Sequence, residues 1–140
     1  MISNVYVSQS LINAADRNRM MDDIMTVSIA RNTMLGITGL LIASPDHFVQ
    51  LLEGSVLGVE EVMHRIGADP RHTACRIIRQ SSINAASCRH FRMARFDYDN
   101  FGTAVIDPLL MAVHTGMDAS AIRRLERLIE AVAKDHVPSK

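Results

Sequence analysis

The chain has no tryptophan, and its other aromatic side chains are few, with four phenylalanines and two tyrosines among 140 residues. Platforms on which nucleobases could stack are therefore not expected. An excess of one charge is also missing, since 15 lysines and arginines balance 15 aspartates and glutamates. Such a chain has no net field that would draw it to nucleic acid or to an anionic membrane. We expect a protein that binds neither.

Long apolar runs and cysteine are scarce as well. No segment reaches the length of a membrane-spanning helix, and the N-terminus lacks the basic-then-apolar pattern of a secretion signal. Cys75 and Cys88 form no CxxC pair. Free thiols in a reducing cytoplasm are the preferred interpretation, and a disulfide or a shared metal remains open. We therefore expect a cytoplasmic protein, and the spacing of the histidines predicts no metal site.

What the chain does contain is enough apolar material for one domain. Apolar residues make up 48% of the sequence and charged residues 21%, which is ordinary for a soluble globular protein. Apolar runs predict strands over about residues 2–8, 40–44, 47–52, 76–83 and 91–98. Helices are expected over about residues 16–32 and 56–68, with Asp16 or Asn18 as the cap of the first helix.

The order of these elements predicts an α+β fold of the ferredoxin-like type. The order is β-α-β-β-α-β plus a fifth strand, so two helices should cover one face of an antiparallel-rich sheet. The link Pro45-Asp46 is short enough to make the strands on either side of it a β-hairpin.

Two further helices are predicted near the C-terminus. Asp107-Pro108 predicts the start of a helix that Gly116 ends, and Asp118 predicts the cap of a helix that runs to about Lys134. The last helix has an apolar face formed by Ile122, Leu125, Ile129 and Val132. We expect this helical pair to cover the other face of the sheet. The chain would then divide into a domain over residues 1–100 and a helical extension over residues 101–140.

A single polar residue, Gln50, interrupts the apolar strand predicted around it. A buried carboxamide costs free energy unless its donors and acceptors have partners. Tyr6 on the first strand and Asn32 at the end of the first helix are the candidate partners. Ile24, Ser28 and Asn32 recur at i, i+4 and i+8, so they share one face of that helix. A tyrosine, a glutamine and an asparagine that converge on one cavity indicate a hydrogen-bond relay around a flat polar ligand.

Five short motifs in order carry a family resemblance. They are Tyr6-x-Ser8, Ser28-x-x-Arg31-Asn32, Gly36-Ile37-Thr38-Gly39-Leu40-Leu41, Phe48-x-Gln50-x-Leu52-Glu53-Gly54 and Ile66-x-x-Asp69-x-Arg71-His72. At this spacing, over roughly residues 2 to 97, the chain resembles the BLUF family of blue-light sensors, which use flavin adenine dinucleotide (FAD). The known ferredoxin-like core of that family agrees with the fold predicted above.

The resemblance implies roles for the central residues. Light would drive an electron from Tyr6 to the flavin, a proton would follow, and the radical pair would recombine. Gln50 would bridge the Tyr6 hydroxyl and the N5–O4 edge of the ring, and its amide would turn or tautomerise. Ile24 and Ile66 would sandwich the ring.

The resemblance also implies the remaining flavin contacts. Asn32 would pair with the pyrimidine edge of the ring, with Arg31 near the same edge, although a helix-end residue and a solvated cation are the plain alternatives. Further contacts are implied for Ser28 and Phe48, and at the ribityl and phosphate end for Arg65, Asp69, Arg71 and His72. Those last four residues could instead be a surface charge cluster. FMN or riboflavin in place of FAD stays open.

The chain departs from the family pattern before and on the fifth strand. The family usually has Arg-x-Phe-x-x-Trp-x-Met there; Arg89 and Phe91 fit, but Ala94 and Phe96 stand at the Trp and Met positions. Those two positions are held to transmit the state of the glutamine, so the output route is in doubt. Met93 could serve after a register shift, but strand alternation predicts that it faces away from Ala94.

The interpretation that follows is a short stand-alone blue-light receptor and not an enzyme. Its output would pass through protein contacts of the C-terminal helices, in a homodimer or higher homo-oligomer or with an unidentified downstream partner. One alternative is a flavin-free ligand-binding or scaffolding module on the same fold. Another is a small enzyme that uses Arg71, His72 and Asn32 on a phosphate-bearing substrate, but nothing resembles an activated nucleophile or a paired acid and base.

Overall fold

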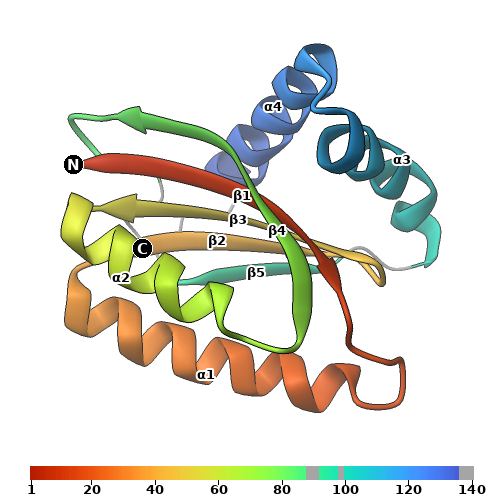
Figure 1. Ribbon diagram of the computed structural model, residues 1–140, viewed down its shortest axis with the longest axis horizontal. Coiled ribbons are helices and arrows are strands. Elements are labelled where there is room, and N and C mark those ends of the chain that lie inside the picture. The colour runs from red at the N-terminus through yellow and green to blue at the C-terminus, as the bar shows by residue number, and fades with distance from the viewer. Residues whose placement is uncertain (88–91, 98–99, 136–140) are drawn as a thin grey trace.

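The computed structural model describes residues 1–87, 92–97 and 100–135 of the chain (Figure 1). Over these residues the strands are β1 (Ile2–Ser10), β2 (Thr38–Ala43), β3 (His47–Gly54), β4 (His72–Ser82) and β5 (Ala94–Asp97). They form one sheet in the order β4-β1-β3-β2-β5. Neighbouring strands are antiparallel except β5, which runs parallel to β2. The predicted ferredoxin-like order with a fifth strand is confirmed.

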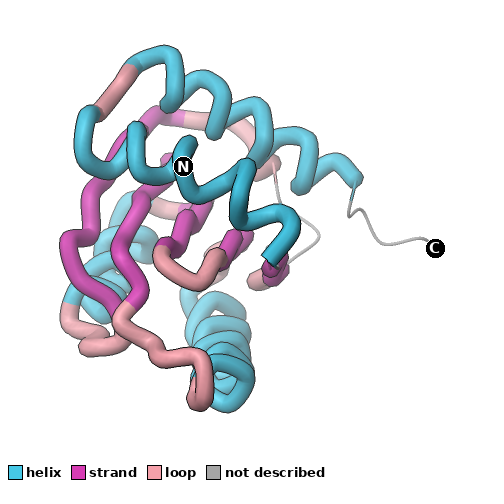
Figure 2. Tube along the Cα trace, turned by 90° about the vertical axis from the view of Figure 1, so that its right-hand side faces the viewer, coloured by secondary structure: helices cyan, strands magenta, loops and turns pink. Residues whose placement is uncertain are grey.

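Helices lie on both sides of this sheet. They are α1 (Arg17–Leu35), α2 (Val56–Gly67), α3 (Asn100–Gly116) and α4 (Ala119–Asp135). Figure 2 shows the sheet between the two helix pairs, with α1 and α2 on one face and α3 and α4 on the other. The predicted placement of the C-terminal helices is therefore confirmed.

Strand alternation divides the core into two layers. Val5 and Val7 face α3 and α4, whereas Tyr6 between them faces α1 and α2. The β1–β3 ladder pairs Tyr6 with Gln50, and the β2–β3 ladder pairs Gln50 with Leu41. These three side chains therefore form one row across the sheet, beneath the first two helices.

Residues next to α1 and α2 explain where these two helices begin and end. α1 runs three residues beyond the predicted end at Asn32 and stops at Gly36, whose φ of 66° is the left-handed geometry that glycine adopts without steric cost. Asp16 precedes α1 but makes no side-chain cap, and its carboxylate accepts a hydrogen bond from Arg19 instead. At the start of α2 the Ser55 hydroxyl accepts from the Gly58 N–H.

The predicted start of the third helix was wrong. α3 begins at Asn100, so Pro108 lies inside the helix and removes one backbone hydrogen bond. Burial explains why the helix runs through Pro108. Ile106, Leu110 and Val113 repeat at helical spacing and pack into the core between the sheet and α4. The Asp107 carboxylate does not cap the helix, and it accepts a 2.6 Å hydrogen bond from the Ser44 hydroxyl.

The fourth helix follows its prediction closely. The Asp118 carboxylate accepts from the backbone N–H groups of Ser120 and Ala121, which confirms it as the cap. Leu125 and Ile129 are buried as expected, whereas Ile122 and Val132 lie at the edge of the core. Its most buried face also includes Ala121 and Ala133.

β4 starts earlier than predicted, and only part of the predicted fifth strand falls on described residues. β4 begins at His72 and not near residue 76, because residues 72–76 pair with the far end of β1. β5 is limited to Ala94–Asp97. The predicted fifth-strand residues Phe91 and Tyr98 lie outside the described residues, as do Arg89 and Cys88.

Candidate functional site

The central contact of the site joins Tyr6 and Gln50. The Tyr6 hydroxyl donates a 2.5 Å hydrogen bond to Oε1 of Gln50, and both side chains are buried. Tyr6 is therefore the partner that the buried carboxamide requires, as the sequence predicted. Burial is the main cause that raises the pKa of the Tyr6 phenol above its ordinary value. The phenol thus stays neutral and remains a donor.

The other end of the Gln50 amide meets Met93. Its Nε2 lies 3.6 Å from the Met93 Sδ, a weak hydrogen bond to sulfur. Gly39 makes room for this contact, because a Cβ there would come within 2.8 Å of the Met93 Cε and 2.9 Å of a backbone oxygen. Ala94 and Phe96 pack against the α3–α4 core on the opposite face. Met93, and not Ala94 or Phe96, is thus the residue before or on β5 that contacts Gln50.

Between α1 and α2, above this row, lies a cavity of about 190 Å³. Its walls bring together residues that are far apart in the sequence, namely Tyr6, Ile24, Val27, Ser28, Arg31, Leu41, Phe48, Gln50, Arg65, Ile66, Asp69, Arg71 and His72. Every predicted site residue except Asn32 is among them. Val27 and Leu41 were not predicted, although Val27 lies one helical turn from Ile24 and Leu41 pairs with Gln50 across the sheet.

Asn32 and Arg31 carry polar atoms that have no partner among the described residues. Asn32 does not contact Gln50 through a hydrogen bond; its Nδ2 donates to the backbone oxygen of Arg92 at 2.7 Å, and its Oδ1 is buried without a partner. Nε and Nη2 of Arg31 are also buried without partners, and burial lowers the pKa of that guanidinium. Unpaired buried donors and acceptors cost free energy. They therefore mark a place where a polar ligand would find both.

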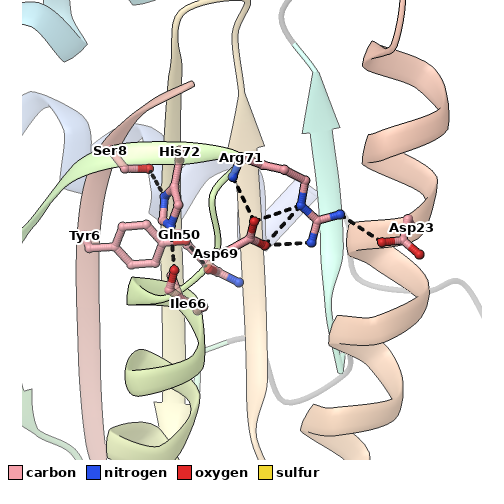
Figure 3. Close-up of polar contacts among 8 residues, drawn as sticks. All are labelled: Tyr6, Ser8, Asp23, Gln50, Ile66, Asp69, Arg71 and His72. Atoms are coloured by element: carbon pink, nitrogen blue, oxygen red, sulfur yellow. Dashed lines mark hydrogen bonds and ion pairs between the residues drawn. The ribbon is translucent and has the colours of Figure 1, made fainter. Parts of the chain in front are cut away.

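The cations expected at the phosphate end already have protein partners. Arg71 donates to both carboxylate oxygens of Asp69 and, through Nη1, to Asp23 on α1 at 2.8 Å (Figure 3). Burial alone would raise the pKa of Asp69, but these bonds hold it below its ordinary value. Arg65 is paired with Glu61 at 2.9 Å. Both guanidinium groups thus already have carboxylate partners, and their contact with a phosphate stays a prediction.

His72 is also committed to protein groups. Its Nδ1 lies 2.7 Å from the Ser8 hydroxyl and its Nε2 lies 2.6 Å from the Ile66 carbonyl oxygen (Figure 3). The ring therefore links β1 to the end of α2.

In the part of the chain that the structure describes, no group of three or more His, Cys, Asp or Glu side chains could hold a metal ion. Cys75 is a free thiol that lies exposed on β4. None of the described helices is both long and apolar enough to cross a membrane.

Comparison with known proteins identifies relatives of this arrangement. A family model described as BLUF, sensors of blue light using FAD, matches residues 1–94. The dark-state structure of BlrB, a BLUF protein, is 30% identical with a TM-score of 0.76 and covers 94% of this chain and 96% of that chain. The ground-state structure of BlsA is 27% identical with a TM-score of 0.68, over 76% of this chain and 72% of that one.

A curated relative is much longer than this chain. The alpha subunit of a photoactivated adenylate cyclase from Euglena gracilis is 28% identical over 78 residues, which are 56% of this chain. The matched residues span only 8% of that alpha subunit and 9% of the beta subunit from the same organism.

Proposed function

The chain belongs to the BLUF family of blue-light sensors that use FAD, and we propose that it is a photoreceptor in which Tyr6 and Gln50 convert light absorption into a hydrogen-bond change. It corresponds to the sensor part of its cyclase relatives and is not itself an enzyme. The observation that carries the proposal is the 2.5 Å hydrogen bond between these two side chains at the wall of the cavity.

The residues of the cavity fit a flavin ring. Ile24 on α1 and Ile66 on α2 supply apolar walls, as a flat tricyclic ring requires. The pyrimidine edge of such a ring offers N–H donors and carbonyl acceptors. Asn32 Oδ1 would accept from that edge, and Nε and Nη2 of Arg31 would donate to it, which would satisfy the buried atoms that lack partners.

The cofactor is proposed to be FAD, held mainly through its ring. Arg65 and Arg71 are already paired with carboxylates, so they would add little attraction for a diphosphate. Asp69, at the same end, would accept from ribityl hydroxyls with its remaining lone pairs. We expect FMN and riboflavin to bind with affinities within about tenfold of that of FAD, since tenfold corresponds to ~1.4 kcal/mol.

The proposed photochemistry uses the polarity of one amide. A bound flavin would supply the absorption of blue light and an electron-accepting group. Tyr6 would give up an electron, which would make its hydroxyl strongly acidic, and its proton would move from Oη to Oε1 of Gln50 along the existing hydrogen bond. An amide has a donor end and an acceptor end, so turning or tautomerising it exchanges donor and acceptor. When the electron returns, Tyr6 would regain one proton: Gln50 would either give back the proton on Oε1 after turning, or keep it there and release one from Nε2 as the tautomer.

The output is proposed to pass from Gln50 to the C-terminal helices. Met93 contacts the Gln50 amide on one face of the sheet, and the next residue, Ala94, packs against the α3–α4 core on the other. A shift of Met93 would therefore move β5 against these helices. Residues 1–100 would act as sensor and residues 101–140 as output. The altered surface would change homodimer or higher oligomer contacts, or a downstream partner's site, in the cytoplasm.

Flash spectroscopy of purified protein tests this function. The wild type loaded with FAD should show a reversible shift of its absorption to longer wavelength after a blue flash. Tyr6→Phe should retain the flavin but lose the shift, whereas Tyr98→Phe, a control at the chain's other tyrosine, should keep it. A normal photocycle in Tyr6→Phe would refute the role of Tyr6. Failure of the wild type to bind any flavin would favour a flavin-free binding module.

A further inference from the structure

His72 contacts the proposed flavin site both at the sheet, through Tyr6 and Phe48, and at α2, through Ile66. Its ring packs edge-on against Tyr6 and Phe48, with centroid distances of 6.1 and 6.3 Å. All three rings line the cavity. The ring is thus a direct neighbour of the proposed electron donor.

The two ring nitrogens of His72 are both occupied, and their partners fix the tautomer. A carbonyl oxygen can only accept, so the 2.6 Å contact with Ile66 O places a proton on Nε2. Nδ1 lies 2.7 Å from the Ser8 hydroxyl, a group that can both donate and accept. Both nitrogens thus already have protein partners, and the contact with the phosphate end that the resemblance implies for His72 stays a prediction.

The contacts of His72 connect β1 and α2, and these two elements carry the proposed electron donor and one wall of the cavity. Ser8 lies on β1, two residues from Tyr6, so it belongs to the same strand as the proposed electron donor. Ile66 ends the buried face of α2 and forms one wall of the cavity. Transfer of an electron and a proton depends steeply on how donor and acceptor are placed. A link between β1 and α2 therefore sets a quantity on which the photochemistry depends.

We propose that His72, whose backbone already pairs with Ser10 of the Tyr6 strand, is a positioning residue that ties the wall of the flavin site to that strand through its Nε2–H bond to Ile66. This inference rests on the proposed function of the site. Its consequence is specific: loss of the bond to Ile66 lowers the yield of the spectral shift per absorbed photon, even when the flavin remains bound.

Two substitutions at this position separate the bond from the ring. The amide of glutamine reaches about as far as Nε2 and can still donate to the Ile66 carbonyl. The shorter asparagine reaches only the place of Nδ1, so it can meet Ser8 but not Ile66. His64→Gln, at an exposed histidine of α2, is the matched control. Flavin affinity, the thermal midpoint and the yield per bound flavin are measured for each variant.

We expect His72→Gln and His64→Gln to give yields near that of the wild type, and His72→Asn to fall by about threefold or more, since transition-state placement enters the rate exponentially. Nitrogen-15 spectra of the wild type should show the Nε2–H tautomer of His72. A wild-type yield in His72→Asn would overturn the inference. Equal losses in His72→Asn and His72→Gln would do the same, because the loss would then follow the missing ring. Absence of any shift in the wild type would overturn the proposed function as well.

Discussion

Gln50 Nε2 donates to the Met93 Sδ across 3.6 Å, so the amide of the central glutamine is confined at the end that faces away from Tyr6. The contact joins β3 to the residue that precedes β5. Any turn of the amide must break it, which gives Met93 a direct influence on how readily the lit arrangement reverts.

Met93→Ala should speed up the return of the lit state. The change removes both the sulfur acceptor and the packing that confines the amide, and each ~1 kcal/mol taken from the barrier is about fivefold in rate. The variant should also lose about 2–5 kcal/mol of unfolding free energy, because Met93 is buried. Flash recovery kinetics and urea unfolding measure these effects. Met93→Leu, which keeps the volume, should recover within about twofold of the wild type; equal recovery in Met93→Ala and the wild type would contradict the confinement.

Asn32→Ala should weaken flavin binding by about fivefold, since it removes an acceptor for the ring edge that is worth roughly 1 kcal/mol; its bond to the Arg92 backbone oxygen is lost as well. Fluorescence titration with FAD measures the affinity. Thr33→Ala is the neighbouring control, because Thr33 is exposed and its hydroxyl donates to the Ile29 carbonyl oxygen within α1. An unchanged affinity in Asn32→Ala would argue against its place at the ring edge.

The raised pKa of Tyr6 predicts a loss of stability at high pH. A buried phenol that resists ionisation contributes stability that is fully present below the unfolded pKa of about 10 and is lost as the pH rises above it, at up to ~1.4 kcal/mol per pH unit. Between about pH 9 and pH 11 the wild type should therefore lose about 1 kcal/mol more unfolding free energy than Tyr6→Phe. Urea unfolding at both pH values measures the difference. Parallel losses in the two proteins would contradict a buried neutral phenol.

The order of elements was predictable because periodicity and turn chemistry act locally. Tyr6 and Gln50 could be matched because a buried amide demands a partner and the two strands pair in register. The start of α3 could not be predicted, since burial of Leu110 and its neighbours outweighs a proline signal that depends only on local sequence. The first residues of β4 are likewise set by pairing with β1.

Ion pairs between residues far apart in the sequence could not be predicted. Arg71 was expected to meet a phosphate, but Asp23, which is 48 residues away, approaches it from α1. Only the tertiary fold decides whether a cation is paired or free. The role of Met93 stayed open for a related reason, because the motif alone gave Ala94 and Phe96 as the positions that transmit the state of Gln50, and only the fold brings Met93 to its amide.

Illumination should loosen or shift the C-terminal helices. β5 packs against them, so a displacement of Met93 would change the packing of α3 and α4 against the sheet. Hydrogen exchange over residues 105–135 should therefore differ between dark and lit samples, while the β1–β3 ladder should be protected equally in both. Identical exchange over residues 105–135 would remove these helices from the output route.

A blue flash given to wild type and Gln50→Leu, both loaded with FAD, tests the central claim most directly. Both proteins should be yellow, because the cavity walls that hold the ring remain. The wild type should show a reversible shift to longer wavelength, and the variant should show none, since leucine can neither accept the Tyr6 proton nor exchange a donor for an acceptor. A shift of wild-type size in Gln50→Leu would contradict the account.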